Sequence, residues 1–464
     1  MSIVTYRLFC CAVAGILLPT FAAHVRIDWH EELGPVKPVN AVGQPPMGGL
    51  PSSAPMFHYL KDAGIPYSRL HDVGGWMGQG LWVDIPNLFP NFDADEGEAS
   101  NYDFVMTDAL IGHLVANGAE PYFRLGVSIE NFAGDGFPAR RIYPPKDLAK
   151  WARISEHVIR HYTEGWANGF HYRIKYWEIW NEPDNFEEVE KNCMWKGDFE
   201  SYIRFYGVVA PYLKAKFSGL KIGGYGSCGF YAGVGANQIK AANSSPRLEY
   251  FVVCARRFLG AVKENGWPLD FFSFHSYSEA SEAIRQVRFA DALLNEYGFC
   301  AERTERHFNE WLPYVGRENL GTAKQAAGIA AELIGLQNGP CDLACIYDAR
   351  CAVGSYSPLF NPLTHKPHKA YYAFLAFNEL RKRRAAVKAK STDPDLWAAA
   401  AKDLNGGAVM LANDSEHELE LVISDCGGNL NFCIITDATS DMRKLDKYPG
   451  RLSPHSFLIA LYGE

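Results

Sequence analysis

Short apolar runs alternate with longer amphipathic segments over residues 38–385 of the chain. In the longer segments apolar residues recur at the spacing of one helix face, as in 146–162. Strands are predicted at 39–43, 65–72, 120–127, 174–182, 221–225, 269–277, 305–311 and 343–348. Helices are predicted at 53–63, 107–117, 146–162, 199–217, 248–265, 279–297, 322–336 and 368–380. This alternation predicts an α/β fold, a (β/α)8 TIM barrel over residues 38–385.

A doubly wound open sheet is the competing architecture for such an alternation. It normally carries a glycine-rich phosphate-binding loop directly after its first strand. No loop of that kind follows the predicted strand at 39–43. The barrel is therefore the preferred interpretation.

The pattern changes at the C-terminal end of the chain. Residues 386–464 hold short alternating runs separated by Gly- and Asn-containing turns, which predicts a small antiparallel β-sandwich. Residues 24–37 contain another short strand, at 25–29. Because this strand lies far ahead of the first barrel strand, we expect it to pack with the sandwich.

The first residues have the pattern of an export signal. Arg7 precedes a short apolar run at 8–18, and the small residues of 20–23 offer a cleavage site. We therefore predict a signal peptide over residues 1–23 and a secreted or periplasmic protein. An uncleaved anchor is the alternative. No later apolar run is long enough for a membrane span, so none is expected after cleavage.

Composition narrows the class of partner. The chain is 48% hydrophobic and 21% charged, which is typical of a globular protein. Its net charge of −8 and the lack of a long basic run give no indication of nucleic-acid binding. Aromatic residues make up 14% of the chain. Many of them are expected in the core, and others would suit a sugar-binding cleft, which needs flat apolar faces with polar edges.

Cysteines leave three readings open. Cys341, Cys345 and Cys351 lie close together in the sequence, and Cys426 and Cys433 could face each other across a hairpin. In an oxidising compartment one or two disulfides are plausible. Buried free thiols and a metal site are the alternatives, although the spacing matches no familiar zinc pattern.

Polar residues gather at the C-terminal ends of the predicted strands, which converge on one mouth of a barrel. They are Arg69 and His71 on the second strand, Asn181 and Glu182 on the fourth, His275 and Tyr277 on the sixth, and Glu310 on the seventh. Three of these residues have an ordinary structural alternative. Glu182 could be a solvated loop residue or a helix cap, His275 a core histidine, and Arg69 a strand-end cap.

Two carboxylates facing each other across such a mouth indicate glycoside hydrolysis. One acid protonates the leaving oxygen while the other attacks or supports the anomeric carbon. The pKa values of the two must therefore differ. We expect Trp177 and Trp180 to raise the pKa of Glu182 by desolvation. Arg69, Tyr277 and Asn309 are expected to keep Glu310 ionised.

The site motifs resemble those of the retaining glycoside hydrolases of clan A, and most closely those of glycoside hydrolase family 39, the β-xylosidase and α-L-iduronidase family. The matching segments are Trp177-Glu178-Ile179-Trp180-Asn181-Glu182-Pro183, Arg69-Leu70-His71, His275-Ser276-Tyr277, Phe308-Asn309-Glu310-Trp311 and Pro367-His368-Lys369-Ala370-Tyr371-Tyr372-Ala373-Phe374. The resemblance implies Glu182 as acid/base and Glu310 as nucleophile. It also implies that Asn181 holds the sugar 2-hydroxyl and that Tyr277 orients Glu310.

We expect a retaining, β-xylosidase-like glycosidase that acts on a plant or microbial saccharide and requires no metal or cofactor. The residues assigned to substrate binding are Arg69, His71, Asn181, His275, Tyr277, Trp311 and Arg350. Retention predicts carboxyl groups about 5 to 5.5 Å apart, whereas inversion predicts about 6.5 to 9.5 Å.

One segment departs from the family pattern. Tyr347-Asp348-Ala349-Arg350 ends the eighth strand, where the family often has Trp. Arg350 would suit an acidic sugar, or it could simply pair with Asp348. A uronide, an arabinoside and an exopolysaccharide therefore remain alternative substrates. A carbohydrate-binding barrel without activity is the alternative from another class. Oligomeric state is not predicted.

Overall fold

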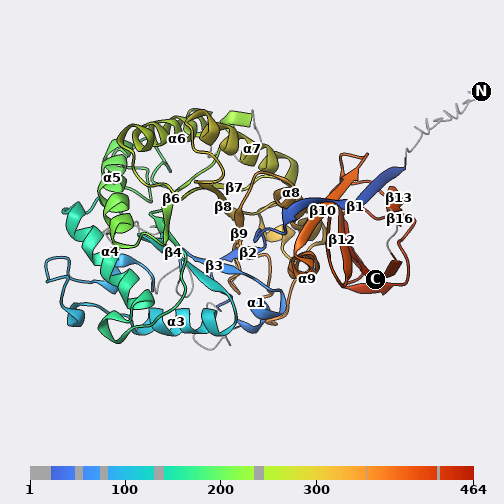
Figure 1. Cartoon of the computed structure of the whole chain (residues 1–464), viewed down its shortest axis with the longest axis horizontal. Coiled ribbons are helices and arrows are strands. Elements are labelled where there is room, and N and C mark those ends of the chain that lie inside the picture. The colour runs from blue at the N-terminus through green and yellow to red at the C-terminus, as the bar shows by residue number, and fades with distance from the viewer. Residues whose placement is uncertain are drawn as a thin grey trace, which may run out of the picture.

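The computed structural model describes residues 22–47, 56–73, 82–129, 141–234, 245–352, 354–425 and 429–463. Two features named above lie wholly or mainly outside these residues: the signal segment and Cys426. The described chain forms a ring of strands surrounded by helices, with a separate sheet at one side (Figure 1).

Eight parallel strands close into a barrel in sequence order, which confirms the predicted fold class. The strands are β2 (Ala41–Gly43), β3 (Tyr67–Leu70), β4 (Glu120–Leu125), β5 (Tyr176–Ile179), β6 (Lys221–Ser227), β7 (Phe271–Ser276), β8 (Glu305–Trp311) and β9 (Leu343–Tyr347). Val42 pairs with Ser68 of β3 and with Ile346 of β9, so the first strand joins the last.

Helices between the strands form the outer ring. They are α1 (His58–Asp62), α2 (Ile85–Leu88), α3 (Val105–Ala116), α4 (Leu148–Thr163), α5 (Phe199–Lys216), α6 (Ser245–Asn265), α7 (Ala280–Glu296), α8 (Ala323–Asn338) and α9 (Lys369–Arg383). On α4 the predicted apolar stripe of Trp151, Ile154 and Val158 is buried. The short helix α2 lies in a segment for which no element was predicted.

Strand β5 is shorter than the sequence suggests. The apolar run predicts a strand to residue 182, yet β5 ends at Ile179. The backbone of Trp180 has φ 71° and that of Glu182 has φ 43°, both in the left-handed region, which a continuing strand does not allow. The chain therefore turns outward just where Asn181 and Glu182 arrive.

The separate sheet has nine strands and forms the appended β-sandwich, in the order β15-β14-β17-β12-β11-β10-β1-β13-β16. Their bounds are Ala23–Pro35 for β1, Ala385–Ser391 for β10, Leu396–Asp403 for β11, Gly406–Asn413 for β12, Leu419–Asp425 for β13, Asn429–Thr436 for β14, Arg443–Leu445 for β15, Arg451–Leu452 for β16 and Ser456–Gly463 for β17. The sheet is antiparallel except where β1 runs parallel to β13.

Alternating residues of β11 pack into two different hydrophobic cores. On β11, Ala398 and Ala400 face the inner core of the sandwich, whereas Ala399 and Ala401 belong to the core of the barrel. Figure 1 shows α8 and α9 on the side of the barrel next to this sheet. Small residues on β11 therefore let the sheet lie close against the barrel helices.

All cysteines within the described residues are free thiols, and most are buried. Cys341, Cys345 and Cys351 are among the buried ones, so of the three alternatives left open for them the structure shows buried free thiols. Within the same residues, no helix is long and apolar enough to span a membrane.

Candidate active site

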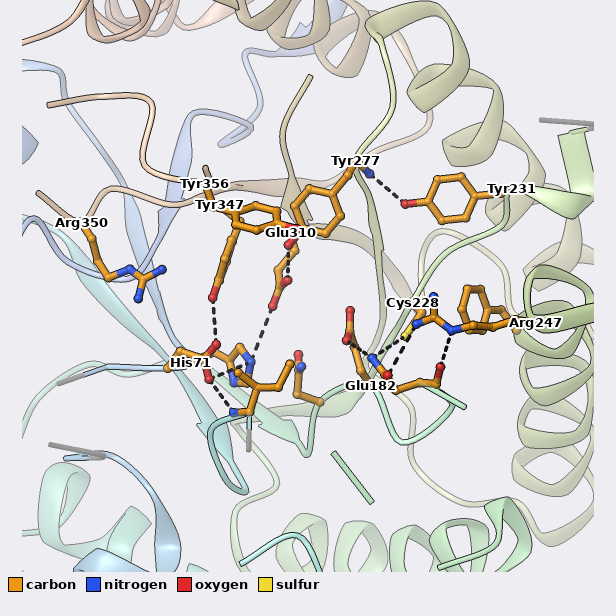
Figure 2. A pocket seen from close by; sticks show the side chains of 15 residues that line it. His71, Glu182, Cys228, Tyr231, Arg247, Tyr277, Glu310, Tyr347, Arg350 and Tyr356 are labelled. Carbon is orange, nitrogen blue, oxygen red and sulfur yellow. Dashed lines mark hydrogen bonds and ion pairs between the residues drawn. The ribbon is translucent and has the colours of Figure 1, made fainter. Parts of the chain in front are cut away.

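A cavity of about 440 Å³ opens at the carboxyl ends of the barrel strands (Figure 2). Residues from strand ends and loops line it together: His71, Asp72, Ile129, Asn181, Glu182, Asn185, Cys228, Tyr231, Arg247, Phe251, Tyr277, Glu310, Tyr347, Arg350 and Tyr356. Six residues singled out in the sequence are in this set: His71, Asn181, Glu182, Tyr277, Glu310 and Arg350. Arg69 and His275 lie just beneath it and contact its carboxylates.

Glu182 is held by three contacts. Its backbone N–H donates to Gly226 O on β6, at 2.9 Å. Asn185 Nδ2 donates to one carboxylate oxygen, Oε2, at 2.8 Å. His275 Nδ1 lies 2.8 Å from the other, Oε1. The turn at the end of β5 thus presents the carboxylate to the cavity and fixes both oxygens.

Glu310 is held from two other strands. Arg69 Nη1 on β3 donates to Oε1 at 2.7 Å, and Tyr277 Oη donates to Oε2 at 2.7 Å. His275 Nδ1 is 3.5 Å from Oε2. Only 4% of Glu310 is exposed, so these charge-assisted bonds act in a largely desolvated place.

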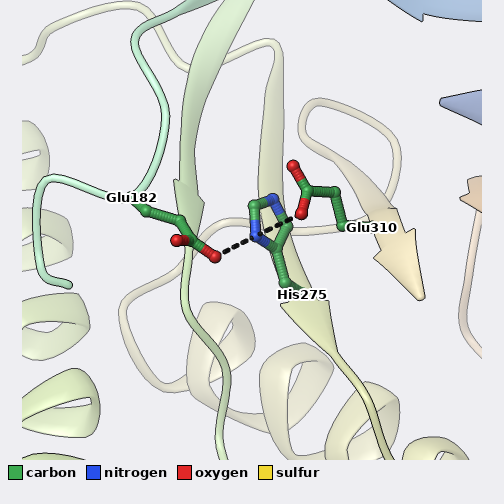
Figure 3. Close-up of side chains that lie close together, drawn as sticks. All are labelled: Glu182, His275 and Glu310. Atoms are coloured by element: carbon green, nitrogen blue, oxygen red, sulfur yellow. Dashed lines mark hydrogen bonds and ion pairs between the residues drawn. The ribbon is translucent and has the colours of Figure 1, made fainter. Parts of the chain in front are cut away.

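His275 lies between the two carboxylates (Figure 3). One ligand atom from each of Glu182, His275 and Glu310 lies within 4.8 Å of the others. Such a group could hold a cation through two oxygens and one nitrogen. Arg69, however, already places its charge 2.7 Å from Glu310 and would repel a second cation there.

The balance of pKa values differs from the prediction. Burial raises the pKa of Glu182, but the hydrogen bond and charge of His275 outweigh burial and hold that pKa below its ordinary value. Burial raises the pKa of Glu310, and the charges of His275 and Arg69 offset this only in part. The same carboxylates raise the pKa of His275 against the effect of burial. Without substrate, therefore, the proton near Glu182 belongs to His275.

The tryptophans do not act as predicted. Trp177 stacks on Phe123 at a centroid distance of 5.0 Å. Trp180 packs edge-on against Trp195 and donates its indole N–H to Met194 O. Both are fully buried in the barrel core. Neither lines the cavity.

Two further assignments need correction. Trp311 has no exposed surface and belongs to the barrel core, so it does not line the cavity. Asn309 donates to Glu178 at 2.6 Å and is not bonded to Glu310. A register shift on β8 between Phe308 and Glu310 interrupts the regular alternation of side chains, so position in the strand alone does not place the neighbours of Glu310.

Arg350 pairs with Asp348, which was one of its two interpretations, and it also lies on the cavity wall. It lines the cavity, and its Nε and Nη2 contact Asp348 Oδ2 at 2.8 and 2.6 Å. Burial lowers the pKa of Arg350, but the Asp348 carboxylate outweighs burial and raises it. The guanidinium is thus a charged wall group whose charge is already compensated.

Asp72 and its hydrogen-bond partners form one wall of the cavity. Asp72 Oδ1 accepts from the backbone N–H of Ile129, and Oδ2 accepts from Tyr347 Oη, both at 2.8 Å. Gln44 Nε2 donates to the same Tyr347 hydroxyl at 3.0 Å. These bonds fix Tyr347, the last residue of β9, on the cavity wall. Burial lowers the pKa of the adjacent His71 well below its ordinary value.

The other side of the cavity was missed in the sequence. Arg247, near the start of α6, donates its Nε to Asn185 O at 2.7 Å and lies over the ring of Phe186 at 4.1 Å. Phe251 lies on the same helix one turn further on. Figure 2 shows Arg247 and Arg350 on opposite sides of the carboxylate pair. Since α6 follows a long loop, no strand pattern could place these residues at the mouth.

Glu178 was also missed as a site residue. Its carboxylate lies beneath the cavity and accepts from Arg69 Nε at 2.7 Å. Alternation in β5 could have indicated it, because Glu178 is a charged residue within an otherwise apolar strand.

Comparisons with known proteins bear on the same segments. The family model of the glycosyl hydrolases family 39 matches residues 58–312. A β-xylosidase of Geobacillus stearothermophilus is 26% identical over 210 residues, which cover 43% of this chain and 36% of that relative. The match thus spans little more than a third of the length of the relative.

Solved structures show the fold over nearly the whole chain. A glucosidase from Croceicoccus marinus has a TM-score of 0.73 at 18% identity, with 96% of this chain and 99% of that chain covered. A family 39 β-xylosidase from Caulobacter crescentus has a TM-score of 0.66 at 17% identity, with 95% and 100% covered.

The family model spans more than half of the chain and includes the strands from β3 to β8 with both mouth carboxylates. The resemblance found in the sequence motifs is therefore confirmed, and the chain belongs to glycosyl hydrolase family 39.

Proposed function

We propose that the protein is a retaining glycoside hydrolase in which Glu310 is the nucleophile and Glu182 the acid/base. The observation that carries the proposal is the carboxylate pair itself, with an oxygen of each within 4.8 Å of the other. This separation supports retention, because an inverting enzyme needs room for a water molecule between its carboxyl groups.

In the first step Glu310 attacks the anomeric carbon as the glycosidic bond breaks. Arg69 and Tyr277 each hold one oxygen of Glu310 and so fix its orientation. Glu182 protonates the leaving oxygen as that oxygen gains charge. His275 Nδ1 is the group that can return a proton to Glu182, since it lies 2.8 Å from Oε1.

In the second step water releases the glycosyl enzyme. The leaving group has left the Glu182 side of the cavity, so water can enter there. Glu182, now an anion, removes a proton from that water, and the water oxygen attacks the anomeric carbon. Two displacements at one carbon return the original anomeric configuration.

We assign the glycone to the Glu310 side of the cavity, with His71, Asp72, Asn181, Tyr347 and Arg350. Arg69 Nη2 donates to Asn181 Oδ1 at 2.5 Å, so Asn181 Nδ2 is left to bind the sugar 2-hydroxyl. The aglycone sits beyond Glu182, with Arg247 and Phe251.

For the substrate we propose a β-xyloside-like glycone. The name of the Geobacillus relative supports this proposal. A uronide remains the second candidate because Arg350 lines the glycone end. The pairing of Arg350 with Asp348 weakens that candidate, because a charge already compensated attracts a sugar carboxylate less.

We also propose that the protein is exported. Arg7 and the apolar run at 8–18 support this location. Secretion into medium or periplasm, with loss of the residues before about 24, is the expected result on expression of the full chain.

A panel of nitrophenyl glycosides tests the activity and the sugar together, with β-xyloside, arabinosides and uronides included. Proton NMR of the first product formed then reads its anomeric configuration. Retained configuration with β-xyloside as the best substrate supports the proposal. Inverted configuration contradicts the mechanism, and a uronide as the best substrate contradicts the sugar.

Loss of turnover in Glu310→Ala, with partial recovery in azide, tests the nucleophile. Azide can then attack the anomeric carbon directly, and the product is the glycosyl azide of inverted configuration. Undiminished turnover in Glu310→Ala contradicts the assignment. Saturable binding of saccharides without any hydrolysis by the wild-type protein would instead support a carbohydrate-binding barrel.

A further inference from the structure

Glu178 is a fully buried carboxylate beneath the cavity, on β5. Its Oε2 accepts from Arg69 Nε at 2.7 Å. Its Oε1 accepts from Ser273 Oγ on β7 and from Asn309 Nδ2 on β8, both at 2.6 Å. Burying a carboxylate costs free energy, and here the charge of Arg69 and the three hydrogen bonds offset that cost.

Arg69 distributes its three nitrogen atoms over three partners. Nε bonds Glu178, Nη1 bonds Glu310, and Nη2 bonds Asn181. The guanidinium is planar and its donors have fixed directions. Once Nε is fixed on Glu178, the directions of Nη1 and Nη2 are fixed as well.

We propose that Glu178 is a positioning residue for the reaction: it anchors Arg69 so that Glu310 and Asn181 are held in place, and its charge offsets that of Arg69. The inference rests on the proposed function, since it gives Glu310 the role of nucleophile. Glu178 itself does not line the cavity and acts only through Arg69.

The charge of Glu178 matters because Arg69 has two carboxylate partners. With both carboxylates present, the positive charge of Arg69 is divided between Glu178 and Glu310, and Glu310 keeps its basicity. With a neutral residue at 178, the full charge of Arg69 would act on Glu310. That would lower the pKa of Glu310 and weaken it as a nucleophile.

Other groups face the two carboxylates and set the background for this effect. Around Glu310 they are Arg69, His71, Glu182, His275, Tyr277, Cys345, Tyr347 and Tyr356. Around Glu178 they are Arg69, Tyr122, Tyr202, Ser273, Asn309 and Cys345. Within the described residues, the second group contains no further acidic side chain that could replace Glu178 beside Arg69.

A purely structural role is the alternative, in which Glu178 only satisfies a buried arginine. Such a role affects stability and does not shift a pH profile. The ionisation of Glu310 sets the acid limb of kcat/KM, because activity is lost as pH falls through its pKa. The acid limb therefore separates the two roles.

The test compares the full-length wild type with Glu178→Gln and Glu178→Asp on the best aryl glycoside of the wild type. For Glu178→Gln we expect kcat to fall at least tenfold with KM changed less than threefold, and the acid limb to move to lower pH by about half a unit or more. For Glu178→Asp, which keeps the charge, we expect the acid limb to return toward wild type. Its kcat stays low because the shorter side chain does not reach Arg69.

Asp291→Asn is the matched control. Asp291 is the carboxylate partner of Arg306, a buried arginine at the start of β8, with Nε to Oδ1 at 2.8 Å. This variant makes the same chemical change beside an arginine away from the mouth. We expect a lower melting temperature and an unshifted acid limb.

An unshifted acid limb in Glu178→Gln, with kcat within twofold of wild type, overturns the inference. Should Glu178→Gln not fold, Glu178→Asp decides: an unshifted acid limb with reduced kcat supports the positioning role, and unchanged kcat contradicts it. A wild-type protein that hydrolyses no glycoside contradicts the proposed function. An active wild type whose kinetics do not change on substitution of Glu178 contradicts only this inference.

Discussion

His275 donates a hydrogen bond from Nδ1 to Oε1 of Glu182 at 2.8 Å, and through this bond it holds the pKa of Glu182 down. A general acid should carry the proton at working pH. In the substrate-free site, however, the proton lies on the histidine. In the mechanism that we propose, entry of a sugar displaces water from the cavity and favours the neutral pair, because desolvation penalises both charges. Proton transfer from His275 would then give Glu182 the proton that it donates to the leaving oxygen.

Replacement of His275 by Asn should move the acid limb of the pH profile upward. The charge of His275 lowers the pKa of Glu310, so without it Glu310 becomes protonated at higher pH. The basic limb of the wild type reports loss of the proton that His275 holds, whereas the basic limb of the variant reports Glu182 alone. Measurement of kcat/KM against pH checks the acid limb. An acid limb that stays in place would contradict the effect of His275 on Glu310.

Tyr277→Phe removes one of the two donors to Glu310. A hydrogen bond to a charged group contributes roughly 1.5–3 kcal/mol, so we expect kcat/KM to fall about tenfold to a hundredfold. The lost donor also lowered the pKa of Glu310, so the acid limb should move to higher pH. This direction is opposite to that expected for Glu178→Gln. Steady-state kinetics over a pH range decides, and an acid limb that moves downward would contradict the contact seen here.

Glu182→Ala should show a dependence on the leaving group. For an alkyl or sugar leaving group, which needs protonation, loss of the general acid costs about 10²–10⁴ in rate. A dinitrophenolate leaves without help, so its release should be little affected and the second step should limit turnover. Kinetics on a series of aryl glycosides of increasing phenol pKa measure the slope. Equal loss for all leaving groups would contradict the acid assignment.

Much of the fold follows from local pattern. The predicted bounds of β8 agree with the observed Glu305–Trp311, and the apolar stripe on α4 faces the core as expected. The predicted end of β5 was wrong because of backbone geometry. The apolar run of β5 gives no sign that Trp180 takes a left-handed conformation and ends the strand. Side-chain periodicity cannot report such a turn.

The candidate site divides in the same way. Arg69, Asn181, Glu182, His275, Tyr277 and Glu310 could be named because they end strands whose order is fixed by the chain. Arg247 could not, because a helix after a long loop brings it to the mouth. The pKa values were predicted in the wrong direction because the sequence cannot show which carboxylate His275 touches. A distance of 2.8 Å to Glu182 against 3.5 Å to Glu310 decides this point.

Glu332 on α8 offers a test of stability away from the site. It is fully buried, neither carboxylate oxygen has a hydrogen-bond partner among the described residues, and burial raises its pKa well above the ordinary value. Its folded form therefore holds a proton that the unfolded chain releases above a pKa of about 4.3. Stability is accordingly lost as pH rises above that value. Glu332→Met removes this loss, so at pH 7 we expect a gain of about 1–3 kcal/mol in the free energy of unfolding.

The free energy of unfolding at two pH values separates two effects at Glu332: the release of its proton on unfolding, and the burial of a polar group without partners. Denaturant unfolding at pH about 4.5 and about 7 should show that the advantage of Glu332→Met over wild type widens with pH. Glu332→Gln is the control: it cannot titrate, so its difference from wild type should change with pH by the same amount. Because its amide still lacks partners, it should remain less stable than Glu332→Met at both values. An advantage of Glu332→Met that does not change with pH would mean that Glu332 is ionised in the folded protein and has a partner that compensates its charge.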